Sequence, residues 1–324
     1  MAQGAKANEV PLNMRVRPAD LHRQRQKRKR FRQNVPLLIL FVPIIAYFVI
    51  FKYVPMGGLV IAFKDYSFRD GILGSPWVGF DNFRLLFSNP MMLNIIRNTL
   101  VISLLSIVIG FPFPIILAIL LNEVRKAVFK KLVQSFVYIP HFLNWVIIGG
   151  IIVTLFAQQG GTINMLLQKI TGSVYPFLYK ELSWLSIFIG SGIWKSVGWG
   201  AIIYLAALAG VSPELYEAAA IDGASKWRQM WHITLPGIRP TIVLVLILSM
   251  GNVMEVGFDQ VYVLQNSAVL NVSEVISTWN YKSGLRGNNM FSVGTALGFF
   301  ESLIGLILVV TANRIARRYG ESIW

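Results

Sequence analysis

The sequence predicts an all-α membrane protein with six transmembrane helices, and three observations support this class. Hydrophobic residues make up 55% of the 324 residues and charged residues only 14%, whereas soluble domains carry about 25% charged residues. The apolar residues gather in six stretches that each reach the roughly 20 residues needed to cross a bilayer as a helix. Lys and Arg concentrate on alternate connections between these stretches, as in a multi-pass topology.

Residues 1–34 are predicted to form a basic cytoplasmic tail. Ten of the 30 basic residues lie in the first 33 positions, most densely between Arg23 and Arg30. Such a tail obeys the positive-inside rule and adsorbs partly on anionic lipid. A nucleic-acid-binding or regulatory arm is the alternative. A long apolar stretch follows without a small-residue cleavage site, which disfavours a removable secretory signal.

Residues 35–324 are expected to form one six-span membrane domain. The spans fall at about 35–56, 95–121, 132–157, 183–210, 239–263 and 290–313. Prolines at positions 36, 43, 112 and 114 lie within the first two spans, where neighbouring helices can satisfy the freed backbone groups. With the amino terminus inside, 20 of the 30 basic residues fall on cytoplasmic segments. Both termini and the connection 212–238 are therefore predicted to be cytoplasmic.

Several kinds of chemistry have no sequence signature. The chain has no cysteine and only three widely separated histidines, so neither a disulfide nor a metal-ligand cluster is indicated. The run from Gly190 to Ser196 lacks the glycine that a phosphate-binding loop needs before its lysine, because Trp194 stands there. No nucleophile elbow and no His-Glu-x-x-His pair is present. The chain is therefore not expected to be an enzyme or to bind a cofactor itself.

The segment 212–238 carries helix start and stop signals. Ser212 is a favoured N-cap and is followed by Pro213, a favoured first helical residue. The helix is expected to run from Pro213 to about Ala220 or Asp222, where Gly223 would end it. A second short helix is expected to begin after an N-cap serine, carry two tryptophans and end at two prolines: Ser225, Trp227, Trp231, Pro236 and Pro240.

A spaced pattern occupies this segment. Glu217-Ala218-Ala219 is followed by Gly223 and, after nine intervening residues, by Ile233-Thr234-Leu235-Pro236. The pattern resembles the EAA loop of bacterial ABC-importer permeases. The resemblance implies that the loop docks on a separate ATPase and transmits its closure to the spans. That coupling falls to Glu217, Ala218, Ala219, Gly223, Ile233, Leu235 and Pro236. From composition alone, an amphipathic connector on the lipid surface is the alternative.

Three runs at or after the end of the first span narrow the resemblance to one branch of the importers. The runs 53–56, 62–66 and 74–79 are similar to the branch of carbohydrate importers that handles polysaccharides and oligosaccharides. The resemblance implies the six-span fold of a type I ABC importer permease, in the bacterial inner membrane, working by alternating access. It also implies a second permease subunit, related or identical, two ATPases that carry ATP and Mg, and an extracytoplasmic solute-binding protein. Nucleic acid is not an expected partner.

Rival functions remain open. A stand-alone secondary carrier or channel would have no use for an ATPase-docking loop. A polysaccharide synthase or export component is disfavoured because no cytoplasmic loop carries a cluster of catalytic carboxylates.

Polar residues within the spans are candidates for a solute path. Asn252, Glu255 and Asp259 in the fifth span follow an i, i+3, i+7 spacing and are therefore expected to share one helix face, which could line the path and bond sugar hydroxyls. The alternative is that the two acids pair with basic residues at the outer end. Asn144 in the third span is a further candidate, although asparagine in a bundle often only bonds between helices.

Lys195 in the fourth span, flanked by Trp194 and Trp199, has two interpretations. It can bind a carboxylated sugar, such as a uronate oligosaccharide of the alginate or pectin kind, with tryptophan stacking on sugar faces. Alternatively, it forms a structural ion pair with an acid of the fifth or sixth span: Glu255, Asp259 or Glu301.

Overall fold

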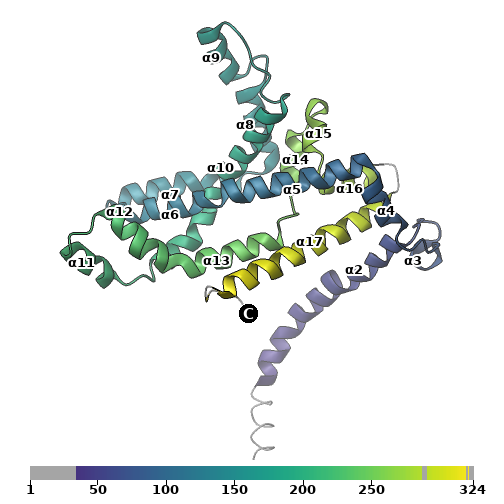
Figure 1. Ribbon diagram of the computed structural model, residues 1–324, viewed down its shortest axis with the longest axis horizontal. Helices are drawn as coiled ribbons and strands as arrows, with labels where there is room; N and C mark the ends of the chain where they lie inside the picture. The colour runs from purple at the N-terminus through teal and green to yellow at the C-terminus, as the bar shows by residue number, and fades with distance from the viewer. Residues whose placement is uncertain (1–33, 287–289, 319, 321–324) are drawn as a thin grey trace, which may run out of the picture. The chain divides into compact units, whose positions relative to one another are not determined.

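The computed structural model describes residues 34–286, 290–318 and 320, and these are helical without any β-strand (Figure 1). One isolated antiparallel bridge joins Lys64 and Trp77. The chain divides into two units, Met1–Leu59 and Val60–Trp324, which are treated separately below. Nearly all of the basic tail expected over residues 1–34 lies outside the described residues, so this boundary stays a prediction.

The first unit contributes most of one apolar helix, Asn34–Phe63. This helix passes through a π-helical turn, η2 (Val49–Tyr53), a short α-helical turn, α2 (Val54–Met56), and a 3₁₀ turn, η3 (Gly57–Phe63). Pro55 explains the change of helix type, because proline donates no backbone N–H and its ring crowds the carbonyl four residues earlier. A widened π turn before the proline relieves that conflict.

Long apolar helices dominate the second unit. α5 (Pro90–Gly110) and α6 (Pro112–Glu123) follow each other directly, and α10 (Glu181–Leu208) packs against both. α13 (Leu235–Gly251) contacts α10 and the last long helix, α17 (Phe291–Arg318). In the described part of the chain, five helices are long and apolar enough to cross a membrane, or six if one bent pair counts as a span.

That bent pair replaces the continuous helix expected over 132–157. α7 (Ala127–Phe142) and α8 (Trp145–Phe156) meet at an angle of 103°. Pro140 lies in the last turn of α7 and weakens its continuation. The side chain of Asn144 accepts a hydrogen bond from the Ile147 N–H at 2.9 Å and so begins a new helix.

The fifth apolar stretch is also broken. α13 ends at Gly251, and α14 (Phe258–Leu264) begins after a non-helical turn. Asn252 caps the end of α13, Glu255 lies in the turn, and Asp259 belongs to α14. The expectation that these three residues share one helix face is therefore wrong, because the helix that would align them is interrupted.

The connections carry short helices. They are α3 (Gly71–Gly74), α4 (Asp81–Ser88), α9 (Thr162–Thr171), η5 (Ser267–Val269), α15 (Leu270–Ser273), α16 (Ile276–Asn280) and η6 (Tyr281–Leu285). Three clusters of buried apolar side chains hold the second unit together. The first joins α4, α5, α16 and α17; the second joins α5, α8, α10 and α14; the third joins α6, α10 and α13.

The segment 212–238 forms an arm of three pieces that leads into the first turn of α13: α11 (Pro213–Ile221), α12 (Lys226–Gln229) and the π turn η4 (Met230–Thr234). The Ser212 side chain caps α11, and the left-handed φ of +73° at Gly223 turns the chain after it. The expectation that Pro236 ends the second helix is wrong, because helix continues from Lys226 to Gly251. Pro236 is tolerated there because it lies two residues after the end of the widened turn η4.

Candidate functional site

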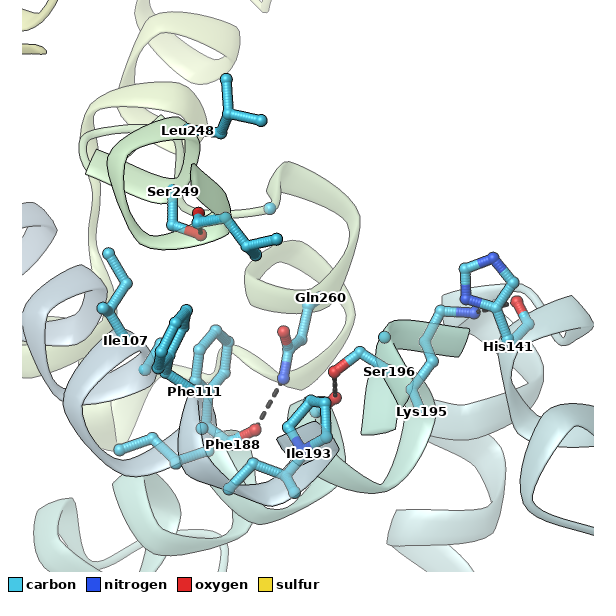
Figure 2. A pocket seen from close by; sticks show the side chains of 18 of the residues that line it. Ile107, Phe111, His141, Phe188, Ile193, Lys195, Ser196, Leu248, Ser249 and Gln260 are labelled. Atoms are coloured by element: carbon cyan, nitrogen blue, oxygen red, sulfur yellow. Dashed lines mark hydrogen bonds between the residues drawn. The ribbon is translucent and has the colours of Figure 1, made fainter. Parts of the chain in front are cut away.

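Two adjoining pockets in the second unit form a groove. Their volumes are about 670 Å³ and 320 Å³. Both are lined by a shared set of residues from α5, α10, α13 and α14, together with Gly257: Ser106, Ile107, Phe188, Ser249 and Gln260. Figure 2 shows the larger pocket with Ile107, Phe188, Ser249 and Gln260 among its labelled lining residues.

Lys195 lies at one end of the larger pocket, next to His141 (Figure 2). Its Nζ donates to the carbonyl oxygens of His141 at 2.9 Å and Pro140 at 3.4 Å, and also to that of Leu143. It lies 5.5 Å from the centroid of the Trp145 ring. The last carbonyls of an α-helix lack partners within the helix and favour a cation. Lys195 therefore caps the end of α7 at the break.

This placement changes the interpretation of Lys195. Among the described residues, none of the ion pairs involves it. The structural ion pair expected with Glu255, Asp259 or Glu301 is therefore wrong. The physical reason is that backbone carbonyl dipoles at the broken span, rather than a carboxylate, stabilise the ammonium group.

The smaller pocket is the more polar part of the groove. Ser103, Asn252 and Glu255 line it together with the shared residues. The Ser103 side chain belongs to a residue that is only 6% exposed, and its Oγ has no hydrogen-bond partner within the described chain. A buried hydroxyl without a partner costs free energy. Ser103 thus adds a buried hydroxyl without a partner in the described chain to the wall of this pocket.

Gln260 connects two walls of the groove. It is 8% exposed, and its Nε2 donates to the Phe188 carbonyl at 2.7 Å, drawn as a dashed line in Figure 2, and to Ser191 Oγ at 3.3 Å. These bonds tie α14 to α10. Gln260 was not predicted from the sequence, although a lone amide in an apolar stretch is the same signal that identified Asn144.

The remaining candidate path residues lie elsewhere. Trp194 lines a separate apolar pocket of about 750 Å³. Trp199 stacks on His141 with ring centroids 4.5 Å apart and planes 1° apart. Asn144 caps α8, and Asp259, in the first turn of α14, lines neither groove pocket. Of the predicted set, the groove brings together Lys195, Asn252 and Glu255.

The arm that precedes α13 presents a different kind of surface. α11 contains no buried residue, and its Leu215 and Ile221 side chains are 54% and 86% exposed. The residues singled out by the EAA-like pattern divide into two groups. Glu217, Ala218, Gly223 and Pro236 are exposed, whereas Ala219, Ile233 and Leu235 are half-buried. Leu235 packs against the third apolar cluster, so it helps to hold the arm in place.

Comparison with known proteins adds to this geometry. Residues 110–321 match the family described as the inner membrane component of binding-protein-dependent transport systems. The chain belongs to this family. Its members are multi-pass inner-membrane proteins, in agreement with the apolar helices of the second unit.

Relatives of this inner membrane component support the assignment. The polygalacturonan/rhamnogalacturonan transport system permease protein YteP of Bacillus subtilis is 47% identical over 302 residues, which cover 92% of this chain and 94% of the relative. A bacterial ABC transporter involved in the import of the acidic polysaccharide alginate contains a chain that is 38% identical with a TM-score of 0.82, covering 90% of this chain and 99% of that one.

A second structure of the alginate transporter was determined in complex with an alginate pentasaccharide-bound periplasmic protein. Its matching chain is 38% identical with a TM-score of 0.83, covering 91% of this chain and 98% of that one. The predicted membership of the ABC-importer permeases is thereby confirmed. The all-α fold of a type I ABC importer permease is likewise confirmed as a class.

Proposed function

We propose that this chain is the transmembrane permease subunit of an ATP-driven importer of acidic, uronate-containing oligosaccharides. The observation that carries the proposal is the groove, whose apolar helices expose serine, asparagine and glutamine side chains to a shared space. Such side chains exchange hydrogen bonds with sugar hydroxyls. The similar proteins are named for the transport of polygalacturonan/rhamnogalacturonan and of the acidic polysaccharide alginate, which are rich in uronic acids.

The acidic character of the cargo is supported by the charge at one end of the groove. Lys195 brings a positive charge into the larger pocket, and carbonyl dipoles rather than a carboxylate surround it. A cation without a counter-charge attracts a passing carboxylate through the low-dielectric interior. We propose that Lys195 acts on the cargo through this field, because its N–H groups already donate to the chain.

The energy would come from partner subunits. In this proposal the arm 212–238 is cytoplasmic and meets an ATPase through Glu217, Ala218, Ala219 and Gly223, while Ile233, Leu235 and Pro236 anchor the arm to α13. Two ATPase subunits would carry ATP and Mg. A second permease subunit would complete the path, and an extracytoplasmic solute-binding protein would deliver the sugar. Both termini would be cytoplasmic, and the spans would form the domain 35–324.

The cargo is tested by uptake in vesicles that contain the whole transporter. The substrates are a galacturonate trisaccharide and its fully methyl-esterified, neutral counterpart. At an effective dielectric of about 20, a carboxylate about 8 Å from Nζ gains roughly 2 kcal/mol, or a factor of about 30. Lys195→Met should therefore reduce uptake of the acid far more than uptake of the ester, and Lys195→Arg should retain the preference. An equal loss for both substrates would refute the role in charge selection.

The coupling is tested on α11. Glu217→Lys should abolish ATP-dependent uptake while the protein remains inserted, whereas Asp65→Lys, the same change at an exposed acid outside the arm, should leave uptake intact. Gly223→Pro should also abolish uptake, because proline requires a negative φ and Gly223 has φ +73°. A stand-alone carrier is the rival function. Transport by the purified chain alone, driven by an ion gradient, would establish the rival and end the importer proposal.

A further inference from the structure

The arm contains a hydroxyl contact that neither the EAA-like pattern nor the groove explains. Tyr216 lies on α11 next to Glu217, and its side chain is half-buried on a helix that otherwise contributes no buried residue. The Tyr216 hydroxyl donates to Thr234 Oγ1 at 3.1 Å. Thr234 is the last residue of η4, directly before α13 begins at Leu235. One side-chain hydrogen bond thus joins α11 to the start of α13.

The acceptor belongs to a buried polar chain. Thr234 is 3% exposed and Gln229 is 6% exposed. Thr234 Oγ1 donates in turn to the Gln229 carbonyl at 3.4 Å, and Gln229 Nε2 donates to the Ala224 carbonyl at 3.1 Å. The two successive bonds from Tyr216 through the Thr234 hydroxyl to the Gln229 carbonyl polarise and strengthen each other in a low-dielectric interior. The Tyr216–Thr234 hydrogen bond therefore joins α11 to a residue that is buried and held by a second hydrogen bond.

From Thr234, α13 leads directly to the groove. Ile238 is fully buried in the third apolar cluster, and Val245 packs against the same cluster. Val245 and Ser249 line the larger pocket, and Ser249 also lines the smaller one. α13 has 17 residues, which correspond to about 25 Å of helix, and Pro240 lies within it. Its start is held in the third apolar cluster by Ile238, on the groove side of Thr234.

Two other links near α11 are weaker, and the second of them reaches α6 from α12. The backbone route passes through Gly223, whose surroundings are open within 4 Å, so this turn can flex instead of transmitting a push. The nearby ion pair between Lys226 and Glu123 spans 3.2 Å, but its side chains are 64% and 45% exposed. Exposed ion pairs contribute little.

We propose that the Tyr216–Thr234 hydroxyl pair is a positioning contact that transmits movement of α11 to α13 and so to the groove. This inference rests on the proposed function, in which α11 meets an ATPase. Tyr216 and Thr234 touch neither the cargo nor ATP. They determine how much of the ATPase movement reaches the groove.

The test compares variants in the complete transporter, reconstituted with its ATPases, partner permease and binding protein loaded with a galacturonate trisaccharide. Tyr216→Phe and Thr234→Val each remove one hydroxyl of the pair. The readout is the number of sugars transported per ATP hydrolysed. Each variant should lower this ratio about three- to tenfold, the equivalent of one lost hydrogen bond. The matched control Tyr179→Phe removes the same group from a tyrosine that is 51% exposed, and should leave the ratio unchanged.

Two further measurements separate transmission from assembly. The amount of ATPase that co-purifies should be unchanged, since the exposed face of α11 is intact in these variants. The double variant should be no worse than the more severe single variant, because both remove the same bond. Three results would each overturn the inference. They are an unchanged number of sugars per ATP in the single variants, a loss in the double variant equal to the sum of the single losses, and a loss of co-purified ATPase as large as the loss in that number. If the unaltered transporter shows no ATP-dependent uptake, the proposed function itself fails and the inference fails with it.

Discussion

The crossing of α7 and α10 gives the sharpest prediction, because these helices meet with almost no space between them at Gly198. A Cβ atom at this position would lie 2.0 Å from the Val137 carbonyl oxygen and 2.6 Å from the carbonyl carbon. Both contacts involve backbone, which cannot rotate away. Carbon and oxygen come no closer than about 3.3 Å in ordinary contacts, so Gly198→Ala must separate the helices by roughly 1.3 Å.

Such a separation also disturbs the cap formed by Lys195, one turn away on α10. The bond from Nζ to the His141 carbonyl, now 2.9 Å, would lengthen beyond hydrogen-bonding range. Overpacking costs about 1–3 kcal/mol, and a hydrogen bond to a charged group contributes about 1.5–3 kcal/mol. Gly198→Ala should therefore destabilise the protein by about 3 kcal/mol or more, which corresponds to a decrease in Tm of roughly 6 °C or more.

The assay is thermal unfolding of the purified transporter in detergent. Gly190→Ala is the matched control, because Gly190 lies on the same helix and its Cβ would meet no atom within 4 Å. That control should be neutral or slightly stabilising, since alanine favours helix more than glycine does. Equal Tm values for the two variants would refute the close crossing of α7 and α10.

Two further predictions concern buried polar groups. Ser103→Ala should leave stability unchanged or slightly higher, because the Ser103 hydroxyl has no partner in the described chain. If Ser103 belongs to the solute path, the KM for uptake by this variant should rise. An unchanged KM would show that Ser103 does not contact the solute. Lys282→Met should destabilise the protein by about 3 kcal/mol, because Glu274, whose side chain is 13% exposed, would lose the ammonium now 2.7 Å away. Adding Glu274→Gln should recover part of the lost Tm, and failure to do so would show that this ion pair does not account for the loss.

Local signals predicted parts of the arm well. Ser212 and Pro213 determine where α11 begins, because capping depends on neighbouring residues alone. Gly223 identified the turn after α11 for the same reason, since its left-handed φ disfavours other residue types. The continuation of helix past Pro236 was not predicted, because a π turn before a proline has no clear sequence signature.

The groove was harder to predict than the arm. Serine in an apolar span commonly bonds to its own helix, as Ser249 Oγ does to the Val245 carbonyl at 2.8 Å, so its presence alone does not indicate a path. Ser103 differs only in lacking such a bond within the described chain, which depends on tertiary packing. The polar spacing of Asn252 and Glu255 was informative, but it marked a break in the helix instead of a face.

The cap on α7 has a consequence for how the chain enters the bilayer. α10 is the least apolar of the five helices in the described chain that qualify as spans. A lysine near the middle of an inserting helix adds a further cost of about 2.5–3.5 kcal/mol. Lys195 finds its acceptors at the end of α7, in the third apolar segment, at Pro140, His141 and Leu143. The third apolar segment, which contains α7, and the fourth, α10, should therefore leave the insertion machinery as a pair. The third segment would be retained until α10 supplies the Lys195 ammonium group that caps the end of α7.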